Sequence, residues 1–500
     1  MPRKGFTRLF VFFGVISTEL RKIFDQTSTD WCDDAKAFSL LLLTTLSDME
    51  GRLKRVEDKL AINSSNSSLP SSKDFLRSPK KRSMRTKSGK SPGGQVGHKG
   101  QGGKLRDDPD QTFKYTIDQC PDCELDLSMH IPDEVIRKQI EDLPPIKTFV
   151  TEYQIERKTC HNCQEQWQAS GYPAHVKHEF AYGPRIKALS TYLSAYQFIP
   201  AKRVKDMLAA FGVTISTGTL DNFRISAADR LAGFVETMRQ SIITSSVGFF
   251  DETGIKVSSV GHWVHVAATH LFSLFSLHRK RGREAHDSMG VLAFFKGLLH
   301  RDDYHSYRDK YDQATHVLCN AHLIRDLKFL IERAGQKIWA EPLRTLLLKI
   351  NEDVQKSTTG KLKLKKQKRH RKRYNELIAL GLKNNPAKIN TLGKTRGRTA
   401  QSKSYNLLIR FRDKSEDILR FMSHPDAEFT NNQAERDLRM NKVRQKVSGG
   451  FRSVGAGEEF MIVRSFIATA VKRGVDPLEE LFKVFTPNDE SYMWLAKHPE

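Results

Sequence analysis

Three acidic residues stand next to apolar or basic segments, where a carboxylate is unexpected unless it has a chemical role such as metal binding. Asp251 closes the apolar run Val247–Phe250, Asp302 follows a short strand-like stretch, and Glu435 stands near the start of a basic, helical-looking segment. Three carboxylates that converge can hold two divalent ions about 4 Å apart and clamp a phosphodiester between them. Magnesium suits such oxygen ligands because it keeps waters and shares phosphate oxygens. Each acid alone is a weaker signal, since most acids are surface charges and Asp251 could instead serve the turn at Thr253–Gly254.

Four of the six cysteines form two pairs, 120-CPDC-123 and 160-CHNC-163. Two thiolates three positions apart on a turn can reach one zinc ion, and a second pair completes a tetrahedral site. We therefore predict structural Zn²⁺ held by Cys120, Cys123, Cys160 and Cys163. A closed site of this kind has no open position, so it is not assigned catalysis. The alternating stretch 145–160 is typical of the hairpins of a zinc ribbon.

The elements that would position the carboxylates form a mixed α/β pattern. Strands are predicted at 247–257, 262–270 and 271–278, followed by a helix at 283–295, a short strand within 296–307 that ends in acids, and a strand–helix pair at 315–334. This order is typical of an α/β fold of the RNase H type. Asp251 then lies on the first, central strand and Asp302 ends the fourth strand, its neighbour. The sequence therefore predicts both acids at one rim of the sheet.

A helical segment precedes these strands. Helices are predicted at 185–197 and 201–211, and a third begins near Thr217, with Ser216 or Thr219 as its cap. Helix, short glycine-containing turn and helix form the outline of a DNA-reading helix-turn-helix. Three packed helices without a DNA-binding role would give the same pattern, so both interpretations stay open.

The N-terminal region combines one helix with basic, low-complexity sequence. Apolar residues from Leu42 to Leu60 recur in steps of four and three, which favours a short coiled coil or a helix packed on its own domain. The Ser/Asn/Pro-rich residues 63–74 are typical of a linker. Residues 73–106 carry eleven Lys or Arg against one acid, which favours contact with phosphates or else a solvated tail.

Net charge narrows the class of partner. The formal charge of +24 and the pI near 9.7 favour nucleic acid first and a membrane surface second, with a merely basic soluble protein as the alternative. Residues 355–374 form a second basic run with ten Lys or Arg and no acid, predicted to contact the DNA backbone or to form a solvated face. The apolar run Leu9–Ile16 is short and lacks a cleavage site, so we expect a cytoplasmic protein with no membrane partner.

Together these motifs resemble the transposase family of insertion sequence 66, a DDE-type group. The resemblance covers roughly residues 40–470. It rests on PGGQVGHKG at 92–100, the paired CxxC motifs, GVTISTGTL at 212–220, DETGIKV at 251–257, LCNAHLIRDL at 318–327 and NNQAERDLR at 431–439. It implies an RNase H-like fold with a DDE triad, Mg²⁺ or Mn²⁺ at the carboxylates, and Asp251 and Glu435 as the first and last acids.

The second acid of the implied triad has two neighbouring candidates. The family pattern of acid, any residue, Tyr, two residues, Tyr falls on Asp302, Tyr304 and Tyr307. Asp303 stands where glycine is usual, so the choice between Asp302 and Asp303 stays open. Asp437 lies two residues beyond Glu435 and would face elsewhere on a helix, which we interpret as a surface charge.

Two further features of the core follow from the same resemblance. Cys319 and His322 match the family's Cys–x–x–His, which makes His322 a candidate contributor to the active site; a buried thiol and a capped histidine are the alternative. Glu435 lies 133 positions after Asp302, a separation that exceeds what a bare RNase H fold needs. Helical periodicity at 337–354 and 370–382 therefore predicts a helical insertion.

The predicted domain organisation is multidomain α/β. It comprises an unassigned N-terminus (1–37), a coiled-coil helix (38–62), a basic Ser/Gly-rich linker (63–106), a zinc-binding domain (107–180), a helical DNA-binding segment (181–240), an RNase H-like catalytic domain (241–470) with an insertion at about 336–425, and a C-terminal tail (471–500).

The expected function is that of a DNA transposase. It would bind the terminal repeats of its element, cleave DNA and join the freed 3′-OH to target DNA. We expect phosphate contacts from Arg436, Arg439, Lys442 and Arg444, with Asn431 and Asn432 as caps of the helix that displays Glu435. A homo-oligomer is expected, and accessory proteins of the element are further candidate partners. A metal-dependent nuclease that only hydrolyses DNA and a zinc-containing DNA-binding regulator are the alternatives.

Overall fold

The computed structural model describes residues 32–61, 97, 103–173, 176–307, 311–388 and 399–486. The apolar N-terminal run, the 63–74 linker and nearly all of the basic 73–106 segment lie outside the described residues. Within the described ranges, no helix is long and apolar enough to cross a bilayer. Helix α2 (Asp33–Ala61) carries the heptad residues from Leu42 to Leu60, and their side chains are exposed, so the coiled coil stays a prediction.

A five-stranded mixed sheet forms the centre of the molecule. Strand β3 (Val247–Val257) lies in the middle of the order β5-β4-β3-β6-β7. β4 (Val260–Ala268) and β5 (Ser273–His278) continue antiparallel on one side, whereas β6 (Leu298–Arg301) and β7 (Thr315–Leu318) run parallel on the other. The predicted strands are therefore confirmed, and β3 is central as expected.

Local chemistry explains the start and end of the outer elements. Ser258 and Ser259 both have positive φ, 47° and 66°, as a two-residue hairpin turn between β3 and β4 requires. Helix α7 (Arg283–Ser288) is shorter than the predicted 283–295. The helix stops early because Gly290 adopts φ of 70°, a left-handed conformation that ends a helix.

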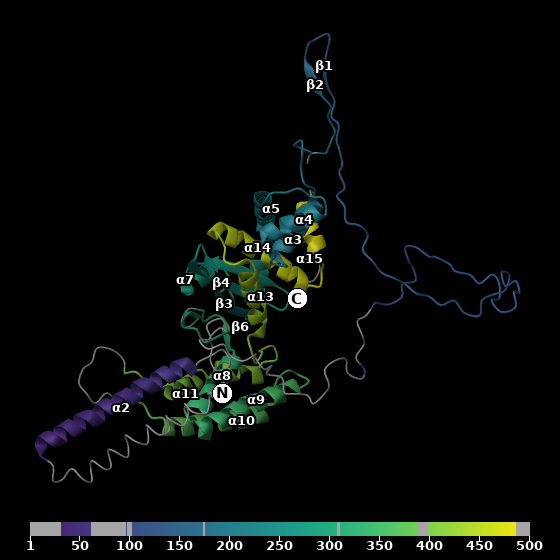
Figure 1. Cartoon of the computed structure of the whole chain (residues 1–500). Helices are drawn as coiled ribbons and strands as arrows, with labels where there is room; N and C mark the ends of the chain where they lie inside the picture. The colour runs from purple at the N-terminus through teal and green to yellow at the C-terminus, as the bar shows by residue number, and fades with distance from the viewer. Residues whose placement is uncertain are drawn as a thin grey trace.

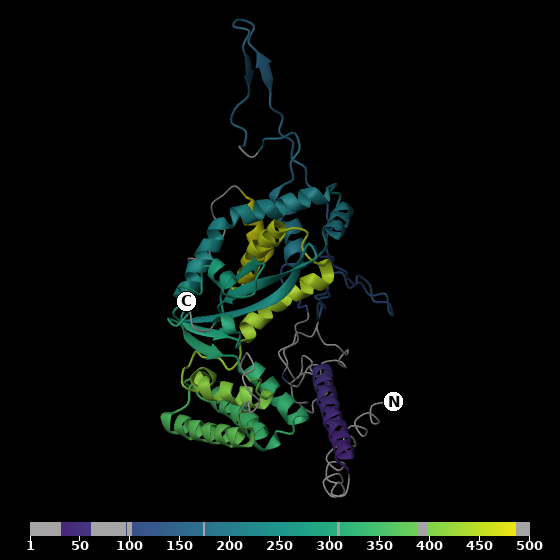
Figure 2. The same cartoon turned by 90° about the vertical axis from the view of Figure 1, so that its left-hand side faces the viewer.

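Two helices from the C-terminal part of the chain pack on this sheet (Figure 2). α13 (Asn432–Ser448) contacts β3 and β4, and α14 (Val454–Lys472) contacts β5. Side chains of α14 also satisfy the outer edge of the sheet, since Ser465 Oγ accepts from Phe275 N and Thr469 Oγ1 accepts from Ser273 N. The sheet edge at β5 is therefore covered by a helix.

The helical segment before the sheet belongs to the same hydrophobic core as the sheet. It comprises α3 (Pro184–Ala195), α4 (Ala201–Ala210), α5 (Thr217–Arg230) and α6 (Ala232–Thr244). The predicted cap of the third helix is confirmed, because Ser216 Oγ accepts from Thr219 N at 3.0 Å. The segment predicted as a C-terminal tail contains α15 (Pro477–Phe485), which packs on α3 and buries Leu481. This part of the chain is thus a packed helix rather than a tail.

The predicted insertion is helical and packs around a second hydrophobic core, which also includes residues of β6 and β7. After α8 (Asn320–Arg333) it contains α9 (Lys337–Gln355), α10 (Leu364–Asn384), α11 (Lys403–Asp413), α12 (Ser415–Leu419) and the 3-10 turn η4 (Arg420–Met422). Trp339 and Tyr374 are fully buried there. These helices lie at one end of the sheet, opposite α3, α4 and α5 (Figures 1 and 2).

Candidate functional site

Asp251 and Asp302 meet because they lie on neighbouring parallel strands. In the β3–β6 pairing Phe249 is opposite His300, so continuing the register by two residues sets Asp251 level with Asp302. Asp251, Asp302 and Glu252 each present a carboxylate oxygen within 4.8 Å of the others. The rim predicted for the first two acids is therefore present in the structure.

The electrostatics of this cluster favour a bound cation. Burial raises the pKa of Asp251 well above its usual value, and the charges of Glu252 and Asp302 raise it further. Burial and Asp302 also raise the pKa of Glu252 to about 7, against the opposing effects of Arg281 and Tyr307. Three crowded acids repel one another until a positive charge neutralises them. The oxygen-only donors of Asp251 and Asp302 fit a divalent ion such as Mg²⁺.

Glu435 lies in a second, adjacent cluster on the first turn of α13. Glu435, Cys319 and His322 offer donor atoms within 4.8 Å of one another. Glu435 Oε1 is buried and has no hydrogen-bond partner among the described residues, and the guanidinium of Arg325 lies 3.9 Å away. A buried carboxylate oxygen without a partner is costly, so it is suited to accept a ligand.

His322 links the two clusters. Burial opposes its charge, but Cys319 and Glu435 outweigh burial and raise the pKa of His322 to about 9. The positive His322 in turn lowers the pKa of Asp251. The structure does not put Glu435 in one ligand set with Asp251 and Asp302. It puts the imidazole of His322 within electrostatic reach of both acids.

Asn431 fixes α13 to the sheet in a way that sequence reasoning missed. Its side-chain amide donates to Phe250 O at 2.7 Å, and its backbone N–H donates to Cys319 Sγ at 3.2 Å. Asn431 is the residue before α13, but its side chain does not cap the helix, so that prediction is wrong for Asn431. The amide instead ties the start of α13 to the backbone beside Asp251.

The structure separates Asp302 from its neighbour Asp303. Asp302 Oδ1 accepts from Tyr304 N at 2.9 Å, and its Oδ2 lies 3.6 Å from Arg281 Nη2. Asp303 points to the insertion, where it pairs with Arg410 at 2.8 Å and with Lys414. Asp302 is thus the one that lies beside Asp251.

Arg281 is a functional candidate without a local sequence signal. Its Nε donates to Glu252 Oε1 at 2.7 Å, and its guanidinium lies over the rings of Trp263 and Tyr304. Tyr307, implied by the family pattern, donates its hydroxyl to Glu252 Oε2 at 2.8 Å. Both side chains hold Glu252 beside the acidic rim.

The four cations predicted to contact phosphate divide into two kinds. Arg436 and Arg439 are exposed on α13. Lys442 donates to the carbonyl of Gly254, and the guanidinium of Arg444 lies 3.6 Å from the centroid of the Phe451 ring. Lys442 and Arg444 therefore also hold α13 against its surroundings, and their contact with phosphate stays a prediction.

Asp437 is also not the surface charge that the sequence suggested. Its side chain is 11% exposed, and its Oδ2 accepts from Lys472 Nζ at 2.8 Å and from Ser273 Oγ at 2.9 Å. The prediction is wrong because α13 packs on the sheet and on α14 with more than one face. Asp437 joins three elements: α13, α14 and β5.

The cysteine pairs form two equivalent turns in the extended segment 103–173, the arm. The second pair lies in the loop of the hairpin β1 (Arg157–Thr159) and β2 (Gln166–Gln168), which forms one tip of this segment (Figure 1). Cys120 N donates to Leu125 O and Cys160 N donates to Glu165 O. Backbone N–H groups within each turn lower the pKa of Cys120 and of Cys160, which favours the thiolate that zinc needs. Among the described residues, no three of the four sulfurs come within 4.8 Å of one another. The structure thus supplies two separate pairs of zinc ligands.

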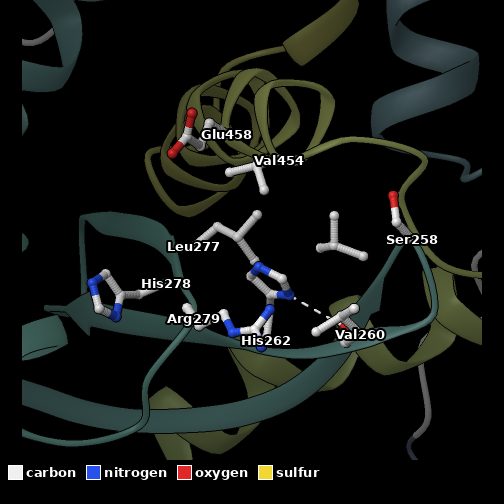
Figure 3. Close-up of a pocket in the computed structure, with 9 residues that line it drawn as sticks. Ser258, Val260, His262, Leu277, His278, Arg279, Val454 and Glu458 are labelled. Atoms are coloured by element: carbon white, nitrogen blue, oxygen red, sulfur yellow. Dashed lines mark hydrogen bonds between the residues drawn. The ribbon is translucent and has the colours of Figure 1, made fainter.

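A cavity of about 460 Å³ lies apart from the acids, where β3, β4 and β5 meet the start of α14 (Figure 3). Val257, Val260, Leu277 and Val454 give it an apolar lining, and His262, Arg279 and Glu458 add polar groups. His262 is turned toward Val260, whose carbonyl lies 3.2 Å from its Nδ1. None of the predicted site residues lines this cavity.

Comparison with protein families accounts for three segments of the chain. Residues 179–459 match the model of the transposase IS66 family, and residues 118–164 match the zinc-finger binding domain of transposase IS66. Residues 19–104 match a family of unknown function. A search of curated proteins gave no match.

These matches define the class of protein as a DNA-binding transposase. Because one family model covers more than half of the 500 residues, the chain belongs to the IS66 family of transposases. The zinc-finger match supports structural zinc in the arm.

Proposed function

We propose that this transposase cleaves DNA at the ends of an insertion sequence and joins the freed 3′-OH to target DNA. The observation that carries the proposal is the convergence of Asp251 and Asp302 from neighbouring parallel strands. Glu435 of α13 lies in the second cluster, which His322 connects electrostatically to Asp251. The strand order and the parallel β3–β6–β7 half of the sheet are typical of an RNase H-like core, which we propose for residues 241–470.

In this proposal the acids act as metal ligands. Asp251, Asp302 and Glu435 would hold Mg²⁺ or Mn²⁺, which when bound activates water or a 3′-hydroxyl and stabilises the leaving oxygen. His322 supports the site by balancing the charges of Asp251 and Glu435. Arg436 and Arg439 are exposed next to Glu435 and would position the phosphates of the scissile strand.

Replacing Asp302 and Asp303 separately tests the choice of the second acid. Asp302→Asn is expected to lower the cleavage rate roughly 10³-fold, because metal stabilisation of the transition state is worth several kcal/mol. Asp303→Asn should keep most of the cleavage but lower the unfolding free energy by about 2 kcal/mol, since it breaks the pairs with Arg410 and Lys414. Cleavage of a labelled element-end duplex and thermal melting measure the two effects. The reverse pattern would assign the site to Asp303.

The basic run on α10 is the proposed contact for the DNA backbone outside the active site. Lys365, Lys368, Arg369 and Lys372 are exposed and recur at helical spacing, so they share one face. Replacing all four by glutamine should weaken DNA binding and reduce the slope of log K against log salt by about 3 to 4, because each phosphate contact contributes about 0.9. Lys349→Gln is the control, since Lys349 is already paired with Glu352. An unchanged slope in the quadruple variant would make this run a solvated face.

A strand-joining assay distinguishes the proposal from a nuclease that uses the same acids. Purified full-length chain, Mg²⁺ and two DNAs, one carrying the element ends and one a target plasmid, should yield covalently joined products. Nicked DNA without joined products would support the nuclease, and binding without cleavage would support a DNA-binding regulator.

The remaining expectations fit this role. We propose that Cys120, Cys123, Cys160 and Cys163 provide the ligands of the structural zinc. The exposed apolar seam of α2 favours a homo-oligomer through a coiled coil. We also propose that the protein is cytoplasmic and that accessory proteins of the element are further partners.

A further inference from the structure

A third cluster of donor atoms lies inside the molecule. It shares Glu252 with the acidic cluster, but its two histidines are used neither by the proposed reaction nor by the zinc arm. Glu252, His265 and His286 offer ligand atoms within 4.8 Å of one another. Glu252 is 7% exposed and each histidine is 2% exposed. The three residues come from β3, β4 and α7, and the β3–β4 register sets Glu252 directly opposite His265.

Three ring nitrogens of the two histidines have no hydrogen-bond partner among the described residues. Nδ1 of His265 and both Nδ1 and Nε2 of His286 are buried and have no hydrogen-bond partner within the described parts of the chain. A buried polar atom without a partner is destabilising, so three in one cluster need a reason. Burial also lowers the pKa of His265 to about 4 and that of His286 to about 3, which keeps both imidazoles in the neutral form that binds metals.

The surroundings orient these groups as in a metal site. Nε2 of His265 lies 3.3 Å from Lys280 O, so a proton on Nε2 leaves the lone pair of Nδ1 free. Metal-binding histidines characteristically donate their second ring N–H to such a carbonyl. His286 stacks on Tyr307 with ring centroids 4.4 Å apart. The Glu252 oxygens accept from Arg281 and Tyr307, and each keeps a further lone pair.

We propose that Glu252, His265 and His286 bind a divalent transition-metal ion, for which zinc is the best match. Two imidazoles and one carboxylate are a donor set that zinc takes in proteins, and imidazole also suits nickel, copper and iron. The ion would join β3, β4 and α7. It is a separate site from the thiolates of the arm and does not depend on the proposed reaction.

Metal counting on the full-length chain tests this site. Untagged protein is loaded with Zn²⁺, desalted and analysed by mass spectrometry for zinc per chain. His286→Phe keeps the ring that stacks on Tyr307 but removes the ligand, and it should hold about one zinc fewer than the unaltered chain. His265→Phe and Glu252→Gln should show the same loss. His424→Ala removes an exposed histidine elsewhere and should lose none.

The zinc count does not depend on DNA cleavage, because the assay contains no DNA. It also does not depend on changes in the arm, because all variants keep the four arm cysteines. Equal zinc content in every variant that melts like the unaltered chain would overturn the proposal. If the variants do not fold, X-ray absorption at the zinc edge of the unaltered chain decides the question. Histidine scattering is expected there, and a spectrum with sulfur ligands alone would equally overturn the proposal.

Discussion

Asp251→Asn is expected to abolish DNA cleavage and strand joining while DNA binding survives. Asparagine has nearly the same shape and can still accept from Glu252 N, as Asp251 Oδ1 does at 2.8 Å. It lacks the negative charge that a divalent ion requires, so several kcal/mol of transition-state stabilisation are lost, or roughly 10³-fold or more in rate. Product formation on labelled element-end DNA measures the loss, and a mobility-shift assay measures binding.

The removal of a negative charge should also relieve repulsion within the cluster. Glu252 and Asp302 both raise the pKa of Asp251, so the asparagine variant should be at least as stable as the unaltered chain. Asp426→Asn is a matched control, because Asp426 is an exposed acid far along the chain. Full cleavage by Asp251→Asn would remove Asp251 from the active site, and equal losses in both variants would point to a nonspecific effect.

Asp437→Ala is expected to be the most destabilising of the replacements considered. It leaves the ammonium of Lys472, whose side chain is 11% exposed, without its carboxylate partner. Breaking a buried ion pair from one side costs about 3–5 kcal/mol. The lower end applies here because the carbonyls of Thr269 and Phe272 still accept from Lys472. The shift of the denaturation midpoint in urea measures the change.

A surface ion pair between α3 and α15 provides the control for this prediction. Arg185 and Glu479 lie 3.2 Å apart but are 71% and 51% exposed, so Glu479→Ala should cost less than about 1 kcal/mol. Equal midpoints for Asp437→Ala and the unaltered chain would show that Asp437 is the surface charge that its position in the sequence suggests.

Local pattern was sufficient to predict the strands and the convergence of two acids. Apolar runs bounded by turns define β3 to β6, and the rule that neighbouring parallel strands end at one rim brings Asp251 to Asp302. The choice between Asp302 and Asp303 could not be made locally, because it depends on Arg410 and Lys414 of the insertion, more than 100 residues away.

The wrong predictions for Asp437 and Asn431 share a physical cause, which is that α13 has more than one packed face. The charge of Asp437 suggested solvent, yet Asp437 accepts from Lys472 of α14. Lys442 likewise donates to the carbonyl of Gly254 on β3, 188 residues away. Asn431 is a residue type that often caps helices, but its side-chain amide donates a hydrogen bond to Phe250 O, 181 residues away. The periodicity of one sequence predicts the face of the helix on which a side chain lies. It does not predict which distant element packs against that face.

The most direct test of the central claim is a metal-specificity switch at Asp251 in the strand-joining assay. A thiolate binds Mn²⁺ better than Mg²⁺, because magnesium prefers oxygen ligands. Asp251→Cys should therefore give no cleaved or joined DNA with Mg²⁺ and should recover products with Mn²⁺, while the unaltered chain works with both. Products from Asp251→Cys with Mg²⁺ at the unaltered rate would contradict the assignment of Asp251 as a ligand of the catalytic metal.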